Sequence, residues 1–153
     1  MTLSKLFETF QVSAFRLEGR PVYLVNEEED ALKFYKNTGR LPEGFSKEWL
    51  EFVRSQTDSK KTIQRLRLLS DRLSDYEAFE LTAYVGVEEG EDIRFAKRRD
   101  YLYEYDFWLF DNRWLARMNY DEDGRYVDST VSEITGKDRE SIDGWLELYG
   151  ASS

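Results

Sequence analysis

The stretch from Asp106 to Tyr120, DFWLFDNRWLARMNY, carries the clearest structural pattern in this chain. Aromatic and branched side chains, which favour β-strands, fill both of its halves. Asp111-Asn112 separates the halves, and this pair tolerates the left-handed backbone of a two-residue hairpin turn. A second turn pattern, Asp121 to Gly124, leads into a further strand pattern from Arg125 to Ile134. These residues predict three consecutive antiparallel strands, a β-meander.

Upstream of the meander, strand and helix patterns are mixed. We expect strands at 12–17, 22–25, 62–69 and 92–96, and helices at 3–10, 27–37, 46–57, 75–85 and, after the meander, 137–149. Ser74 followed three residues later by Glu77 is a capping box that marks the start of one helix. No linker, repeat or low-complexity segment interrupts the chain, so we expect one domain over residues 1–153. The pattern predicts an α+β fold, a single mixed sheet of about six strands flanked by helices.

The composition excludes several kinds of chemistry. The 153 residues contain no cysteine and no histidine. A thiol nucleophile, a disulfide framework, an iron–sulfur cluster, a thiolate zinc site and a Ser-His-Asp triad are therefore ruled out. No apolar stretch is long enough for a signal peptide or a membrane span, so we expect a soluble, cytoplasmic protein. We expect no cofactor, no bound metal and no catalytic residue.

The charge balance bears on the partners of the protein. Acidic residues number 31 against 22 basic ones, which gives a net charge of −9. Because non-specific binding to nucleic acid or to anionic lipid comes from neutralising phosphates, this balance argues against both. Two short basic islands, at 51–72 and 94–100, stand out in the acidic chain. They are interpreted mainly as solvated faces or as partners of the acidic segments beside them.

The residues Asn119 to Gly124 resemble the first half of a calcium-binding loop. Such a loop needs a bidentate carboxylate at its twelfth position. That position is occupied by Thr130. A hairpin turn with Gly124 at its positive-φ position explains these residues better.

The strand expected at 62–69 carries two arginines on one face. Arg65 and Arg67 alternate with Leu66 and Leu68, so the leucines lie on the opposite face. An unpaired buried charge costs several kcal/mol. The arginine face must therefore be open to water, paired with acids, or lining a pocket.

Other polar residues are expected near these arginines. Ser70 and Arg72 follow the carboxyl end of the strand, where open α/β sheets bind ligands. Tyr76 and Glu80 lie one helical turn apart on the next helix and are directed at the same place. Two interpretations stay open: a structural network, such as Arg67 with Glu80, or a pocket for a small anionic ligand.

An aromatic segment follows the second basic island. It contains Tyr101, Tyr103, Tyr105 and Trp108. The three tyrosines alternate, so an extended chain presents them on one side. Because Tyr, Trp and Arg concentrate at binding hot spots, the segment is a candidate surface for a partner protein. Stacking on bases is the rival interpretation, which the negative charge disfavours.

The chain resembles an uncharacterised actinobacterial family in four segments: SAFRLE at 13–18, SDRLSDYEAFE at 70–80, GEDIR at 90–94 and DFWLFDNR at 106–113. The resemblance covers about 7–128. Genes of that family often lie beside Xre-type helix-turn-helix regulators, so the resemblance implies a regulatory partner and no known reaction. We therefore expect a non-enzymatic accessory protein whose acidic surface suits a basic regulator. The alternative is a sensor of a small anionic ligand.

A more distant resemblance is to a phospholipase D-like half-domain, in the order of its helices and strands and in the DFWLFD hairpin. Active members carry His-x-Lys-x4-Asp on the strand before that hairpin. If Asp111 takes the place of the final Asp, then Asp106 replaces the Lys and Glu104 replaces the His. The resemblance thus implies a degenerate hydrolase domain that has lost its nucleophile and its cationic clamp.

Overall fold

The computed structural model of this chain describes residues 1–85, 90–99 and 102–153. In this part of the chain, six strands form one mixed sheet in the order β3-β2-β1-β4-β5-β6. The strands are β1 (Ser13–Glu18), β2 (Thr62–Leu69), β3 (Glu91–Lys97), β4 (Phe107–Phe110), β5 (Trp114–Tyr120) and β6 (Tyr126–Glu133). The first three are parallel, and the last three form an antiparallel meander whose β4 pairs with β1. The predicted α+β class, six-stranded sheet and C-terminal meander are confirmed.

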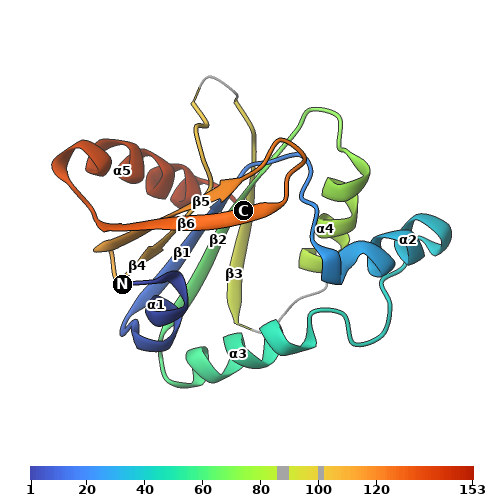
Figure 1. Cartoon of the computed structure of the whole chain (residues 1–153), viewed down its shortest axis with the longest axis horizontal. Coiled ribbons are helices and arrows are strands. Elements are labelled where there is room, and N and C mark those ends of the chain that lie inside the picture. Colours follow the sequence, from blue (N-terminus) through green and yellow to red (C-terminus); the bar gives the residue numbers. More distant parts are fainter. Residues whose placement is uncertain (86–89, 100–101) are drawn as a thin grey trace.

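Helices cover both faces of the sheet. They are α1 (Leu3–Thr9), α2 (Glu29–Thr38), α3 (Lys47–Asp58), α4 (Asp75–Val85) and α5 (Gly136–Ala151), with a 3₁₀ turn η1 (Asn26–Glu28) before α2. Figure 1 shows α5 on one side of the sheet and α1 with α3 on the other. Helices α2 and α4 lie together beyond the same end of the sheet. None of these helices, within the described residues, has the length and apolar character needed to cross a membrane.

Alternation along the central strands separates two apolar cores. Leu66 and Leu68 of β2 pack with Ile142 and Tyr149 of α5. Ile63, from the opposite face of β2, packs instead with residues of α1 and α3. Because β1 and β2 are buried on both faces, the arginines between these apolar residues are buried as well. The two faces predicted for residues 62–69 are confirmed.

The predicted strand at 22–25 does not form. Strand β1 already has β2 on one edge and β4 on the other, so no edge is left for a hairpin partner. The segment runs instead past the turn between β5 and β6, where Leu24 N donates a hydrogen bond to Gly124 O over 3.1 Å. Its hydrogen bonding is therefore to a turn and not to a strand of the sheet.

Both predicted meander turns are confirmed. Asp111 and Asn112 have φ values of 54° and 53°, and Gly124 has a φ of +94°. The carboxylate oxygen Oδ1 of Asp121 accepts hydrogen bonds from the backbone N–H groups of Asp123 and Arg125, both over 2.9 Å. Among the described residues, no group of three or more acidic side chains is placed to hold a metal ion. The acidic residues here are explained by the turn.

The carboxylate of Asp111 also ties the meander to the start of β1. It accepts hydrogen bonds from the backbone N–H groups of Gln11, Val12 and Ser13 over 2.9, 2.7 and 3.0 Å. The residue that resembles the phospholipase D aspartate therefore holds backbone amides in this structure.

Candidate functional site

A cavity of about 540 Å³ lies over the sheet face that carries α1 and α3. Much of its wall is aromatic: Phe7, Tyr23, Phe45, Trp49, Tyr76, Phe79, Tyr84, Trp108, Tyr120 and Tyr126. Its charged lining residues are Arg16, Glu18, Glu28, Arg65, Glu80 and Glu91. The volume lies within the roughly 300–1,000 Å³ of small-molecule sites, which combine apolar walls with a few polar groups.

Arg65 is the central cation of the cavity floor. Its Nε donates to Glu91 Oε1 over 2.7 Å, and its Nη1 donates to Glu18 Oε2 over 3.0 Å. Glu91 in turn accepts a hydrogen bond from the indole of Trp49 over 3.0 Å. The guanidinium carbon of Arg65 also lies 5.2 Å from the ring centre of Tyr84, within the range of a cation–π contact. Arg65 is thus neutralised by two carboxylates from β1 and β3.

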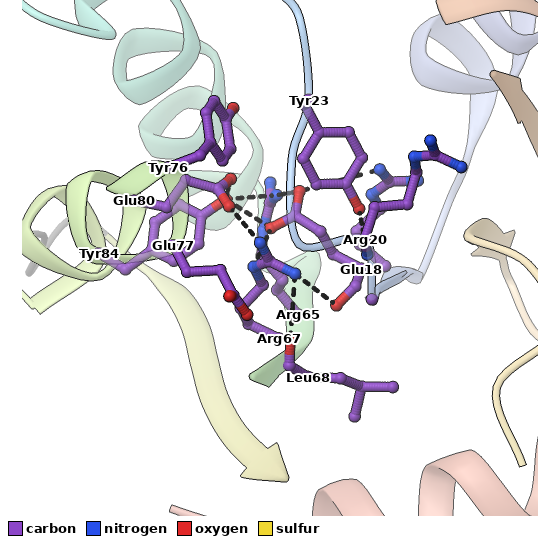
Figure 2. Close-up of polar contacts among 12 residues, drawn as sticks. Glu18, Arg20, Tyr23, Arg65, Arg67, Leu68, Tyr76, Glu77, Glu80 and Tyr84 are labelled. Carbon is purple, nitrogen blue, oxygen red and sulfur yellow. Dashed lines mark hydrogen bonds and ion pairs between the residues drawn. The ribbon is translucent and has the colours of Figure 1, made fainter. Parts of the chain in front are cut away.

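Arg67 lies behind this floor and is fully buried. Its Nη2 donates to Glu80 Oε1 over 2.7 Å, and its Nε lies 3.4 Å from Glu18 Oε1. Its Nη1 donates to the backbone oxygen of Leu68 over 3.0 Å. Figure 2 shows Arg67 between Glu18 and α4, which carries Glu80. The Arg67–Glu80 pair of the network interpretation is therefore present, and only Nε of Arg67, 3.4 Å from Glu18 Oε1, is left without a hydrogen bond among the described residues.

The hydroxyl group of Tyr84 bridges two carboxylates. It lies 2.7 Å from Glu18 Oε1 and 2.8 Å from Glu80 Oε2. Since a phenol has one hydrogen, it can donate to only one of them. A proton on Glu80 completes the chain: Glu80 donates to Tyr84, and Tyr84 donates to Glu18.

Burial and the neighbouring charges determine whether Glu18 or Glu80 binds this proton more readily. Burial, followed by the negative charge of Glu18, raises the pKa of Glu80 to about 8, although Arg67 acts in the opposite direction. Burial also opposes ionisation of Glu18, but the charges of Arg65 and Arg67 outweigh it and lower the pKa of Glu18 to about 2. The two carboxyl groups therefore share a proton more readily than isolated glutamates do, and the arginine charges favour Glu80 over Glu18 as its site.

A second branch of the network is centred on Asp106. Its carboxylate accepts hydrogen bonds from Arg16 Nη2 over 3.1 Å, from Gly19 N over 2.9 Å, and from the hydroxyls of Tyr23 and Tyr103. Arg16 is 5% exposed, and its Nη1 is buried without a hydrogen-bond partner among the described residues. Within the described part of the chain, the carboxylate of Asp106 thus accepts four hydrogen bonds, whereas the Nη1 group of Arg16 donates none.

With this geometry established, a comparison with family models places the chain. It matches the model described as "Domain of unknown function (DUF6879)" over residues 1–147. The chain belongs to the DUF6879 family. The expectation of an uncharacterised family is thereby confirmed, and the match extends beyond the 7–128 region of the resemblance. No curated protein matches the chain.

In this DUF6879 member, four of the residues predicted for a site come together. Arg65, Tyr76, Glu80 and Trp108 all line the cavity. Tyr76 donates its hydroxyl hydrogen to Glu28 Oε1 over 2.7 Å. The juxtaposition follows from the topology, because β2 leads directly into α4 and places the start of that helix beside the arginine face.

Ser70 and Arg72 lie outside the cavity lining. The backbone N–H of Ser70 donates to Glu77 Oε2 over 2.8 Å, and Glu77 Oε1 accepts from Ser74 N over 2.9 Å. Together with the bond from Glu77 N to Ser74 Oγ over 3.0 Å, the bond from Ser74 N forms the predicted capping box at the start of α4. Arg72 is exposed. The connection after β2 therefore serves as a helix cap in this structure.

The predicted aromatic surface is divided between two environments. Tyr103 is half-buried and bonds to Asp106. Tyr105 is half-buried against Phe107, and Arg117 lies 4.4 Å from the centre of its ring. Tyr101 lies outside the described residues. Tyr103 and Tyr105 are thus engaged in contacts within the chain.

The most important site residues missed by the sequence interpretation are Arg16 and Glu18. They alternate with Phe15 and Leu17 in the segment SAFRLE, as Arg65 and Arg67 alternate with leucines. The same argument about charges on a buried strand face applies to them and would have found them. Glu91 carries no such signal, since it stands at the first position of its strand, beside Asp92.

Proposed function

We propose that this protein binds a small organic molecule in the cavity and acts as a non-enzymatic sensor or accessory protein. The observation that supports the proposal is the combination of an aromatic wall with a buried ionic floor. Replacing a buried ion pair by well-packed apolar residues is often neutral or stabilising. The buried network beside an open cavity therefore favours a role for its charges in recognition.

The environment of the arginines does not favour a small anion. Arg65 and Arg67 are bonded to carboxylates, so an anion would have to displace these partners. Arg16 is paired as well, with Asp106, and keeps only Nη1 free. The proposal therefore departs from an anion sensor and takes the aromatic wall as the main source of affinity.

Thermal melting in the presence of a chemically mixed set of small molecules tests this function. A compound that binds only the native state raises the melting temperature by mass action. The variant Ala83→Phe places a ring on the cavity wall and should lose the stabilisation. Ala151→Phe, an equal change at an exposed end of α5, should keep it. No stabilising compound, or equal stabilisation of Ala83→Phe, would contradict the proposal.

Binding of a helix-turn-helix regulator is the second candidate, and a groove along α5 favours it. This groove of about 500 Å³ is lined by Leu102, Trp145 and Leu148, with Leu102 53% exposed. Exposed apolar patches of this kind mark interaction sites. The net charge of −9 suits a basic partner. Co-purification with a regulator encoded beside the gene tests it, and Trp145→Ala and Leu148→Ala should weaken the complex.

A further inference from the structure

Resting on the small-molecule function proposed above, we infer that the cavity selects an organic cation: an amine with an apolar body and a hydrogen-bond acceptor. Three features of the cavity support this ligand class, and the first two share Glu28. They are an excess of carboxylates in its lining, a half-buried glutamate at one wall, and a buried donor without an acceptor.

The first feature is the charge of the lining. Two arginines, Arg16 and Arg65, stand against four glutamates at 18, 28, 80 and 91. The two further members of the network, Arg67 and Asp106, lie behind the lining and cancel each other. Even with a proton on Glu80, the cavity keeps an excess of negative charge. A bound cation compensates this charge, whereas a bound anion increases it.

The second feature is Glu28 of η1. Its Oε1 accepts the hydroxyl hydrogen of Tyr76, and no ion pair joins its carboxylate to another side chain of the described residues. Burial raises the pKa of Glu28, and the negative charge of Glu18 adds to this, although the hydrogen bond from Tyr76 and the charge of Arg65 act in the opposite direction. The rings of Tyr76 and Phe79 lie on the same wall, and aromatic faces attract cations. An ammonium beside Glu28 therefore meets both a carboxylate and aromatic rings.

The third feature is Arg16. Its Nη1 is buried and has no hydrogen-bond partner among the described residues. An unsatisfied buried donor is costly, and Arg16 lines the cavity although Nη1 itself is shielded, so a ligand acceptor gains affinity when the guanidinium turns toward it. The ligand thus carries a carbonyl, ether or ring nitrogen in addition to its ammonium group.

A matched set of phenylalanine derivatives varies the charge while keeping the ring and a carbonyl acceptor. At about pH 6, below the pKa of an α-amino group, phenylalaninamide is a cation, N-acetylphenylalaninamide is neutral, and N-acetylphenylalanine is an anion. Their binding is measured by quenching of tryptophan fluorescence, since Trp49 and Trp108 line the cavity, and by thermal melting. We expect phenylalaninamide to bind at least roughly tenfold more tightly than the other two, the change that one charge-assisted contact produces.

Two variants locate the effect. Glu28→Gln keeps an acceptor for Tyr76 but removes the charge, and should weaken phenylalaninamide binding roughly tenfold while leaving the neutral amide unchanged. Glu27→Gln removes the same charge at an exposed neighbouring position and should have little effect.

The outcomes separate this inference from the proposed function. If the neutral or anionic compound binds as tightly as the cation, the cation preference is wrong while small-molecule binding stands. Equal binding of phenylalaninamide to Glu28→Gln and wild type also overturns it. If none of the three compounds binds, the ligand class is wrong, and the mixed compound set decides separately whether the cavity binds small molecules.

Discussion

Arg67 Nη2 donates to Glu80 Oε1 over 2.7 Å, and the two side chains are 0% and 7% exposed. The pair joins the middle of the sheet to α4, the helix that forms one wall of the cavity. Glu18 Oε1 of β1 also lies 3.4 Å from Arg67 Nε. The three side chains thus come from β1, β2 and α4. The stability of this region should therefore depend on the pair.

Replacing Arg67 by methionine should destabilise the protein by about 3–5 kcal/mol, since it takes one cation from the buried carboxylate of Glu18 and leaves the buried carboxyl group of Glu80 without its partner. The double variant Arg67→Met/Glu80→Leu should cost less than the sum of the single variants, because it removes both members of the pair. Urea denaturation measures the free energies of unfolding. Arg72→Met, at an exposed position, is the control and should be nearly neutral. An Arg67→Met variant as stable as wild type would refute the structural role.

The pH dependence of stability should carry a contribution from Glu80. Its pKa is about 8 in the folded protein against an ordinary 4.5, so the folded chain binds this proton more tightly than the unfolded chain. This contribution is full below about pH 4.5 and is lost as the pH rises toward 8. Glu80→Gln should therefore flatten the decline in the urea midpoint between pH 5 and 8, whereas the exposed-site control Glu104→Gln should not. An unchanged decline in Glu80→Gln would contradict this assignment.

Glu18 should contribute with the opposite sign. Its pKa is about 2 in the folded protein against 4.5, so the folded chain releases this proton more readily. The contribution is full above about pH 4.5 and is lost as the pH falls toward 2. Glu18→Gln should lower the stability at pH 6 and should lose less than wild type on acidification. Parallel acid-unfolding curves for the two proteins would argue against it.

Removal of the Asp111 carboxylate should destabilise the protein. Asp111→Ala leaves three backbone N–H groups without their acceptor, at a cost of about 1–3 kcal/mol. Asp111→Asn keeps one side-chain oxygen and a residue type that tolerates the left-handed turn, so its loss should be smaller. Thermal melts of the three proteins give the order. If Asp111→Ala has the same melting temperature as wild type, the role of Asp111 in holding the start of β1 is wrong.

The turn at Gly124 should resist substitution. Its φ is +94°, and an added Cβ would lie 2.8 Å from the backbone oxygen of Val22. Gly124→Ala should therefore cost more than about 1 kcal/mol. Gly144→Ala is the matched control, because a Cβ there meets nothing within 4 Å and α5 gains helix propensity. Chemical denaturation compares the two, and equal stabilities would show that the Gly124 turn adapts.

Segment β2 was predicted correctly and residues 22–25 were not, because the first depends on interactions between near neighbours and the second on a distant strand. The alternation of Arg65 and Arg67 with leucines is local, so it predicted both faces of the strand correctly. Residues 22–25 have an equally good local pattern, yet β4 occupies the edge that they would need. A segment about 85 residues away decides which strand pairs with this edge. The local pattern of residues 22–25 holds no information about that competitor.

The sequence by itself determined the α+β class, the meander and its turns, and the requirement that the face carrying Arg65 and Arg67 be open to water, paired with acids or lining a pocket. These depend on side-chain periodicity, turn chemistry and the cost of a buried charge, which act between near neighbours. The pairing of Arg67 with Glu80 was one of the sequence interpretations, but only the tertiary structure decided the other acidic partners and that a cavity stands over the arginines. Arg65 pairs with Glu18 and Glu91, which lie on two other strands. Arg16 pairs with Asp106, which lies 90 positions later in the chain. Such pairings arise from strand order and helix placement, because charges meet only where the packing of the whole chain brings them together.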